Sequence, residues 1–377
     1  MKIGVPRESA AGERRIALVP ESAKKLVEQG NEVVIERARS ASVDFSDAAY
    51  TAAGARIAAD AGEVLAGSDL VLKIQPPSEA EIASLRTGAV LVAILQPFQN
   101  GDTVRRLAEK SVTGFSLDLL PRITRAQAMD VLSSMSTIAG YKGVLIAAAA
   151  LPKMVPLLMT AAGTLKPARF LILGVGVAGL QAIATARRLG AVVEAFDIRP
   201  AVKEQVESLG ARFVAHEAIQ SGGETKGGYA TELTPEQQAR QREALGKHIG
   251  EADAILCSAL VPGRRAPILL SAEQVALMRP GSVVVDLAAD QGGNCALTKP
   301  GETVEHGGVR VLAPLNVPAS VPLHASQMLS RNFQNFLLHV LKKGELQLDL
   351  ADEITSGTLV TRDGKIVHAA VESALRG

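Results

Sequence analysis

The sequence predicts an α/β protein with two Rossmann-like domains, each built on a parallel sheet. Short apolar runs alternate with amphipathic runs along most of the chain, a pattern typical of βαβ units. A glycine-rich stretch at residues 174–179 joins an apolar run to a helical run, as the first βα turn of such a domain requires. The length of 377 residues is sufficient for two domains.

The first 120 residues contain apolar runs of strand length, separated by helical patterns. Apolar runs of four to eight residues are typical of strands that are buried on both faces of a sheet. The stretch ESAKKLVEQG (21–30) predicts an amphipathic helix, for which Gly30 is a suitable C-cap. The predicted strands are KIGVP (2–6), EVVIE (32–36), DLVLKI (69–74) and GAVLVAIL (88–95).

A second α/β block begins near residue 133. Helices are predicted at residues 178–189 and 200–210, each between two strand-like runs. The predicted strands of this block are RFLILGVG (169–176), AVVEAFD (191–197), ARFVAH (211–216), AILCSAL (254–260) and SVVVDLA (282–288).

The tail of the chain does not continue the alternation of the second block. It contains a long helical run at 326–341 and then two β-like runs around Asp363-Gly364, which predict a hairpin. We therefore expect the tail to return to the first domain. The predicted domains are residues 1–132 with 320–377, and residues 133–319.

Charge and composition exclude several classes of protein. Forty basic and 39 acidic residues give a net charge of +1, so nothing favours nucleic acid or an anionic membrane as a partner. Cys257 and Cys295 have no metal-ligand spacing, so we expect buried, reduced thiols, no metal site and a cytoplasmic location. The apolar stretch 144–151 ends at Pro152, short of the ~20 residues that span a membrane. We expect the chain by itself to be soluble.

The glycine-rich turn reads GVGVAG and predicts a dinucleotide site. Gly174 permits the tight turn, Gly176 lets the backbone approach a pyrophosphate, and Gly179 lets helix and strand pack closely. Asp197 follows Gly179 by 18 residues, at the end of the next predicted strand, where an acid accepts hydrogen bonds from the adenosine ribose. Its charge favours NAD over NADP, although Arg199 is suited to a 2′-phosphate. The alternative is a glycine-rich turn without a nucleotide.

Six stretches resemble the alanine dehydrogenase/transhydrogenase family, and the resemblance covers nearly the whole chain. It implies two Rossmann-like domains with NAD bound in the cleft at the second domain. It adds Val177 and Ile198 to the expected NAD contacts, and Ala259 and Leu260 as residues that border the adenine or are plain strand-end core. The stretches are GVPRE (4–8), RRIALVP (14–20), LVLKIQPP (70–77), GVGVAGLQA (174–182), LVPGRRAP (260–267) and DQGGNC (290–295).

The stretch PRITRAQAMDVLSS (121–134) predicts a helix that begins with polar side chains. Gln127, Asp130 and Ser133 are three residues apart, near one helix face. They serve either as ordinary helix-start residues or as a binding site. The stretch resembles a loop of the transhydrogenase members of the family, which implies that Arg122, Gln127, Asp130 and Ser133 hold the nicotinamide ring.

A polar, glycine-rich insertion at residues 221–249 interrupts the second block. Thr234 and Pro235 predict a helix start within it. The insertion is either a surface loop or, as the resemblance implies, a mobile loop at about 221–234 that closes over NAD. Gly228 and Tyr229 are then cofactor-binding residues.

The residues expected at an amino-acid site are incomplete. By resemblance, Lys73 and Arg15 match a catalytic lysine and a carboxylate-binding arginine of alanine dehydrogenases, and Asp290 matches an acidic position. Gln96 occupies the position of the catalytic histidine, and glutamine does not titrate. Asn316 lies where the family's chain nears the nicotinamide, or simply forms a turn.

These features favour the transhydrogenase members of the family. The resemblance implies direct hydride transfer from NADH to NADP⁺ held by a partner, coupled to proton translocation. The implied partners are a membrane-spanning proton-channel subunit and an NADP(H)-binding subunit. They imply a homodimer on the cytoplasmic face of the cell membrane. The alternatives are a soluble alanine dehydrogenase-like amino-acid dehydrogenase and a non-catalytic NAD-binding regulatory module.

Overall fold

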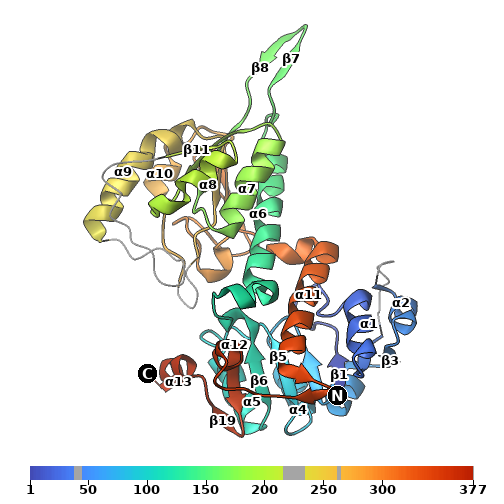
Figure 1. The fold of residues 1–377 in the computed structure, drawn as a ribbon. Coiled ribbons are helices and arrows are strands. Elements are labelled where there is room, and N and C mark those ends of the chain that lie inside the picture. Colours follow the sequence, from blue (N-terminus) through green and yellow to red (C-terminus); the bar gives the residue numbers. More distant parts are fainter. Residues whose placement is uncertain (38–44, 215–233, 261–264, 377) are drawn as a thin grey trace. The chain divides into compact units, whose positions relative to one another are not determined.

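The computed structural model describes residues 1–37, 45–214, 234–260 and 265–376. The chain divides into two compact units, Met1–Met135 with Ala319–Gly377, and Ser136–Pro318. The boundaries expected from the sequence, 132/133 and 319/320, lie beside this division. Each unit is an α/β structure around its own large sheet (Figure 1).

In the described part of the first unit, eight strands form one sheet in the order β19-β18-β6-β5-β4-β1-β2-β3. The six strands from β6 to β3 are parallel, whereas β18 is antiparallel to β6 and β19 is antiparallel to β18. The strands are β1 (Lys2–Val5), β2 (Glu32–Glu36), β3 (Arg56–Ala58), β4 (Leu70–Leu72), β5 (Val90–Ala93), β6 (Thr113–Ser116), β18 (Leu359–Arg362) and β19 (Lys365–Ile366), with a separate pair β16 (Leu341–Lys342) and β17 (Glu345–Leu346).

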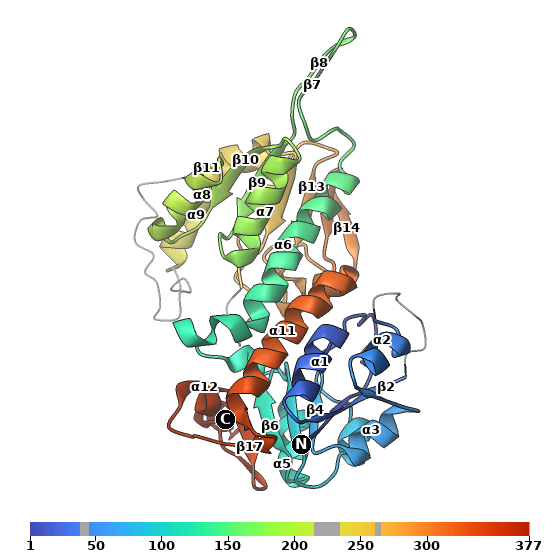
Figure 2. The ribbon, with the colours of Figure 1, turned by 45° about the vertical axis from the view of Figure 1, so that its right-hand side comes forward.

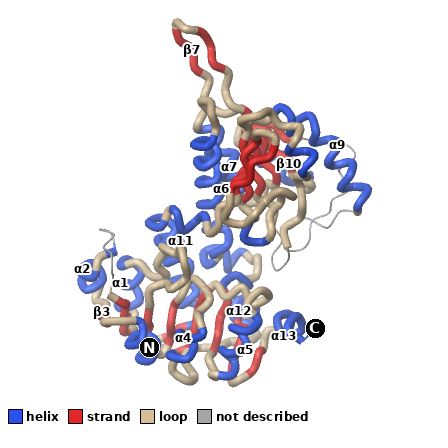
Figure 3. The backbone as a smooth tube through the Cα atoms, turned by 180° about the vertical axis from the view of Figure 1, so that it is seen from behind, coloured by secondary structure: helices blue, strands red, loops and turns tan. Residues whose placement is uncertain are grey.

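Helices flank this sheet (Figure 3). The predicted helix after β1 begins at Pro20, and Gly30 follows its C-cap with a positive φ of 84°, a conformation that favours glycine. The helices are α1 (Pro20–Glu28), α2 (Asp47–Ala52), α3 (Ala61–Gly67), α4 (Glu79–Ser84), α5 (Gly101–Glu109), α11 (Pro322–Val340), α12 (Glu353–Thr358) and α13 (Ala369–Arg376), with 3₁₀ turns η2 (Leu117–Leu119) and η3 (Thr124–Met129).

The C-terminal tail is part of the first unit. Helix α11 packs beside α1 (Figure 2), and its Phe336 meets Phe115 of β6 edge to face at 5.3 Å between ring centroids. Strand β18 adds to the sheet through Leu359, which pairs with Phe115. The hairpin predicted around Asp363-Gly364 is confirmed as β18 and β19.

In the described part of the second unit, seven strands form a sheet in the order β11-β10-β9-β12-β13-β15-β14. All neighbours are parallel except β14 and β15, an antiparallel hairpin that the apolar pattern did not predict. The strands are β9 (Arg169–Leu173), β10 (Val192–Phe196), β11 (Arg212–Phe213), β12 (Ala254–Cys257), β13 (Val283–Asp286), β14 (Thr303–His306) and β15 (Val309–Leu312).

The helices of the second unit include the two predicted at 178–189 and 200–210. Helix α9 begins at Pro235, as the Thr234-Pro235 pair predicted. A further hairpin, β7 (Leu158–Thr160) with β8 (Gly163–Leu165), extends away from the body of the unit (Figure 1) and was not predicted. The helices are α6 (Val131–Ala150), α7 (Val177–Arg188), α8 (Lys203–Ser208), α9 (Pro235–Glu251) and α10 (Ala272–Val275), with 3₁₀ turns η4 (Pro200–Val202), η6 (Ala289–Gln291) and η7 (Val317–Ser320).

Helix α6 is longer than the apolar stretch suggested. Among the described residues, this 20-residue helix is the one segment long and apolar enough to cross a membrane by length and composition alone. Its Val144 and Ala147 are fully buried and belong to the same core as Phe170 of β9. The same length and composition therefore fit a core helix.

Two glycines in helices of the second unit separate close packing from helix propensity. A Cβ at Gly140 of α6 would overlap the carbonyl oxygen of Ala178 in α7, whereas one at Gly246 of α9 would meet only Leu277 at 3.8 Å. We expect Gly140→Ala to destabilise the protein by about 1–3 kcal/mol, because backbone atoms must shift. Gly246→Ala is the control and should stabilise by up to about 1 kcal/mol. Denaturant unfolding of both full-length variants measures the difference, and equal effects would contradict this account of α6 and α7.

Candidate functional site

The turn between β9 and α7 has glycines for two different physical reasons. Gly174 has a positive φ of 92°, and a Cβ there would lie 2.9 Å from the nitrogen of Ala259. A Cβ at Gly179 would overlap the carbonyl oxygen of Gly174. Both positions therefore exclude a side chain, so that α7 can pack against the turn.

Gly176 is not required by the packing of the protein itself. Its φ of −82° suits any residue, and a Cβ there would meet no atom of the described chain within 4 Å. Gly176 is also the N-cap of α7, and the first N–H groups of a helix lack intrahelical partners. The turn thus leaves open space beside free N–H groups at the positive end of a helix dipole, an arrangement that suits a phosphate.

Val177, the first residue of α7, is 39% exposed. Its backbone therefore lies at the surface of the turn, next to Gly176. This position is compatible with the expected cofactor contact, which stays a prediction.

Asp197 lies directly after β10, and both of its carboxylate oxygens are engaged. Oδ2 accepts from the N–H of Val175 at 2.7 Å and from Nη2 of Arg199 at 2.9 Å, while Oδ1 accepts from Nε of Arg199 at 2.9 Å. Arg199 also donates to the carbonyl oxygen of Val175 at 3.1 Å. A ribose that binds Asp197 therefore has to share or replace the Arg199 pair. Ile198 lies between these two residues, half-buried.

Ala259 and Leu260 follow β12, on the next strand beside the glycine turn. Ser258 donates from Oγ to the carbonyl oxygen of Gly174 at 2.9 Å, which joins the two strand ends. Ala259 is half-buried and Leu260 is 38% exposed. Their expected place at the adenine is compatible with this position and stays a prediction.

Sequence reasoning missed a polar hub that holds Ala259. The side-chain amide of Asn294 accepts from the Ala259 N–H at 3.0 Å and donates to the Ala259 carbonyl at 2.9 Å. Fully buried Asp286, at the end of β13, accepts from the N–H groups of Asn294 at 2.7 Å and Cys295 at 2.9 Å. The signal was available, because DQGGNC is one of the stretches that carry the resemblance and SVVVD is a strand that ends in an acid.

The stretch 121–134 differs from the single helix that was predicted. The 3₁₀ turn η3 ends at Met129, and Asp130 adopts an extended conformation before α6 begins. Asp130 accepts from the N–H of Ser133 at 2.9 Å and from its hydroxyl at 2.5 Å, so it caps α6. The expectation of three side chains on one helix face is therefore wrong, because the cap breaks the helix at Asp130. Gln127 on η3 and Arg122 before it are exposed.

Gly228 and Tyr229, like the whole predicted mobile loop except Thr234, lie outside the described residues. Cys257 and Cys295 are both buried, as predicted. Desolvation raises the pKa of Cys257 well above its ordinary value and that of Cys295 to about 11. Neither thiol is activated as a nucleophile.

The residues of the amino-acid alternative lie in the first unit, at the carboxyl ends of its strands. Lys73 is 1% exposed, and its Nζ lies 2.7 Å from Glu81 Oε1 and 3.4 Å from Glu8 Oε2. Desolvation raises the pKa of Glu8 despite the nearby ammonium group, whereas the pKa of Glu81 is lowered because its bond from Lys73 outweighs desolvation. Lys73 is therefore held between two carboxylates of the chain itself.

Arg15 is held in the same way. Its guanidinium donates to both oxygens of Glu13, at 2.7 and 2.5 Å, and Gln75 donates to Glu13 at 2.8 Å. Desolvation opposes ionisation of Glu13, but the Arg15 bonds prevail and lower its pKa to about 2. Gln96 is exposed and has a positive φ of 47°.

Two further expected residues are joined in the second unit. The backbone N–H of Asn316, which has a positive φ of 45°, donates to Oδ2 of Asp290 at 3.2 Å. Asn316 thus occupies the left-handed turn conformation that asparagine tolerates well.

Comparison with known proteins gives these features a family. Residues 4–139 match the family described as "Alanine dehydrogenase/PNT, N-terminal domain", and residues 143–369 match "Alanine dehydrogenase/PNT, C-terminal domain". The first portion of the NAD(P) transhydrogenase subunit alpha of Rhodospirillum rubrum, a separate polypeptide, is 47% identical over 380 residues, which cover 98% of this chain and 99% of that protein.

Two solved structures are similar over almost the whole chain and confirm the predicted fold class. A transhydrogenase from Sinorhizobium meliloti has a TM-score of 0.88 at 41% identity and covers 97% of this chain and 100% of its own. An L-alanine dehydrogenase has a TM-score of 0.83 at 29% identity and covers 100% and 99%. Sequence similarity to the transhydrogenases is thus the greater. The chain belongs to the alanine dehydrogenase/transhydrogenase family.

Proposed function

We propose that this chain is the NAD(H)-binding subunit of a proton-translocating transhydrogenase. It binds NADH, and hydride passes directly to NADP⁺ held by a partner, with the stereochemistry of a Re/Si-specific enzyme. When bound, the nicotinamide supplies the hydride chemistry, and the protein supplies binding, orientation and electrostatics.

Gly176 is the observation that carries the nucleotide site. Nothing in the described chain prevents a side chain at this position, so the open space serves something outside the chain. The pyrophosphate of NAD fits that space, because it would receive N–H groups from the start of α7. Asp197 at the end of β10 supplies the carboxylate for the ribose and disfavours a 2′-phosphate.

The segment with Arg122, Gln127, Asp130 and Ser133 is proposed to hold the nicotinamide ring. Gln127 is exposed, and an amide side chain both donates and accepts, as a carboxamide requires. Asp130 and Ser133 are bonded to each other at the start of α6. Their role is to fix the backbone next to the ring as well as to contact it. Gly228 and Tyr229 are proposed to close over the cofactor.

The partners are proposed from the names of the relatives. The Rhodospirillum rubrum protein is named as a portion of a subunit alpha, and a name of this kind implies further subunits. We propose a membrane-spanning proton-channel subunit and an NADP(H)-binding subunit as partners. The chain then acts as a homodimer, peripheral on the cytoplasmic face of the cell membrane.

The alternative, an alanine dehydrogenase-like enzyme, has less support. Lys73 and Arg15 are present, but each already forms an ion pair with buried carboxylates of the chain. Amino-acid oxidation also needs proton transfers, and Gln96 at the position of the base does not titrate. Hydride transfer between two nicotinamides needs no proton transfer at that step.

The nucleotide site is tested by Gly176→Ala. We expect NADH to bind at least about tenfold more weakly, because the new methyl group occupies the space proposed for the pyrophosphate. The free energy of unfolding should change by less than about 1 kcal/mol, since only the N-cap preference is affected. Titration of NADH fluorescence and denaturant unfolding measure the two quantities. Unchanged affinity would remove the main support for the site.

The nicotinamide end is tested by Gln127→Ala, with Thr124→Ala on the same 3₁₀ turn as control. Loss of one hydrogen bond to the ring should slow hydride transfer by about five- to tenfold, with NADH affinity changed less than twofold. Stopped-flow transfer from NADH to NADP⁺ on an added NADP(H)-binding subunit gives the rate. A rate equal to that of the control would argue against Gln127.

The choice between the two family activities is tested with alanine. The purified chain with NAD and alanine should give no NADH, because Lys73 and Arg15 are occupied and the base is replaced. Absorbance at the nicotinamide band, with a known alanine dehydrogenase as positive control, is the measurement. Steady NADH production would favour the alternative.

A further inference from the structure

We propose that Asn332 and Asn335 of α11, together with Asp352 before α12, are positioning residues that fix η3. The proposal rests on the proposed function, because η3 carries Gln127. All of these residues belong to the first unit, although about 200 residues of sequence separate η3 from α11.

The first anchor is the carbonyl oxygen of Ala128, near the end of η3. It accepts from Nδ2 of Asn332 at 2.9 Å and from Nδ2 of Asn335 at 3.0 Å. The last carbonyls of a short helix lack intrahelical donors, so side chains have to supply them. The two asparagines are three residues apart and share one face of α11, so both amides reach the same oxygen.

Packing alone does not explain an amide at position 332. Asn332 is 6% exposed, and its Oδ1 is a buried acceptor without a hydrogen-bond partner in the described part of the chain. Burying an unsatisfied acceptor costs free energy that a leucine of similar size would avoid. The N–H groups of the same amide, which bond Ala128, account for asparagine here.

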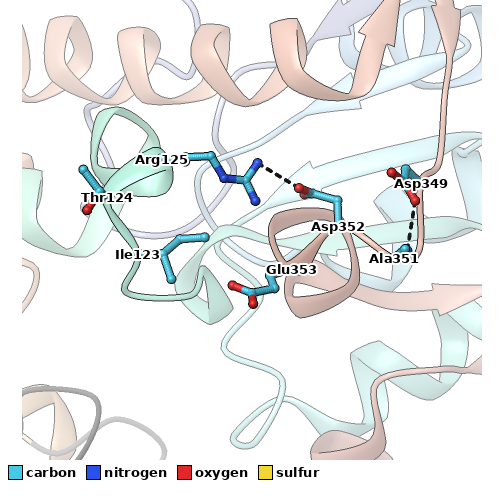
Figure 4. A pocket seen from close by; sticks show the side chains of 7 residues that line it. All are labelled: Ile123, Thr124, Arg125, Asp349, Ala351, Asp352 and Glu353. Atoms are coloured by element: carbon cyan, nitrogen blue, oxygen red, sulfur yellow. Dashed lines mark hydrogen bonds and ion pairs between the residues drawn. The ribbon is translucent and has the colours of Figure 1, made fainter.

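The second anchor is an ion pair at the other side of Gln127. Nη1 of Arg125 lies 2.9 Å from Oδ2 of Asp352, and Figure 4 shows Arg125 reaching from η3 toward that carboxylate. Oδ1 of Asp352 accepts from the N–H groups of Ile354 and Thr355, which begin α12. Nε2 of His339 lies 2.9 Å from the same oxygen.

The carboxylate of Asp352 is thus fixed before Arg125 reaches it. Desolvation works against its charge, but the bonds from Thr355, Arg125 and His339 prevail and lower its pKa to about 2. It stays ionised throughout the physiological range. The aspartate transmits the position of α12 to η3.

Gln127 lies between the two anchored positions, 125 and 128. Its backbone is held on both sides, whereas its side chain is exposed. The freedom that remains is largely that of the side chain itself. A group that is pre-positioned in this way loses less entropy when it binds the nicotinamide.

The test compares full-length variants by hydrogen exchange and by hydride transfer to NADP⁺ on the NADP(H)-binding subunit. Asn332→Leu with Asn335→Ala removes the first anchor, and Arg125→Gln removes the second while it leaves the cap of α12 intact. Gln334→Leu is the matched control, since Gln334 is 7% exposed, lies on the same helix and also has an unpartnered amide oxygen among the described residues.

We expect backbone exchange within 124–130 to accelerate about tenfold or more in both anchor variants and to be unchanged in the control. The transfer rate should fall about fivefold with NADH affinity changed less than twofold, and Arg125→Lys should restore most of the rate. Unchanged exchange would overturn the anchoring. Faster exchange with an unchanged transfer rate would overturn the positioning role. A wild-type protein that transfers no hydride refutes the proposed function instead, and exchange alone then decides the anchoring.

Discussion

The nucleotide site depends on one close approach, that of helix α7 to the turn after strand β9. Gly179 comes so near the carbonyl oxygen of Gly174 that a methyl group cannot fit, and Gly140 of α6 is equally tight against Ala178. These contacts fix the start of α7 relative to the strand ends. Asp197, through the Val175 N–H, and Ser258, through the Gly174 carbonyl, then join the neighbouring strand ends to the turn. Rigid backbone, rather than long side chains, therefore shapes the place where phosphate is proposed to bind.

The strands and helices that depend on local pattern could be predicted from the sequence. EVVIE is β2 over the same residues, and the glycine turn lies between β9 and α7 as expected. The break at Asp130 could not be predicted, because the cap and a continuing helix place the same residues at nearly the same spacing. The Asn294–Asp286 hub and the anchors on Ala128 join residues far apart in sequence. Such contacts follow from the tertiary fold, which a single sequence does not give.

The first unit shows how a charged cluster can be kept without a ligand. Lys73 and Arg15 are buried, and each faces carboxylates of its own chain instead of solvent. The cost of desolvating these charges is compensated within the cluster, and removal of one partner would leave the other uncompensated. The same residue types that resemble a substrate site therefore also suffice to hold the strand ends together. The polar cluster is part of the fold of this unit whichever activity the chain has.

The pairing of Asp197 with Arg199 has a consequence for how firmly a dinucleotide is retained. The carboxylate already receives three charge-assisted or backbone bonds in the free protein. A ribose that takes their place exchanges one set of bonds for another, so the net gain is smaller than for an unpaired acid. Weak retention at the adenosine end shortens the residence time of the nucleotide. Rapid exchange of spent for fresh carrier is what a continuously cycling hydride donor requires.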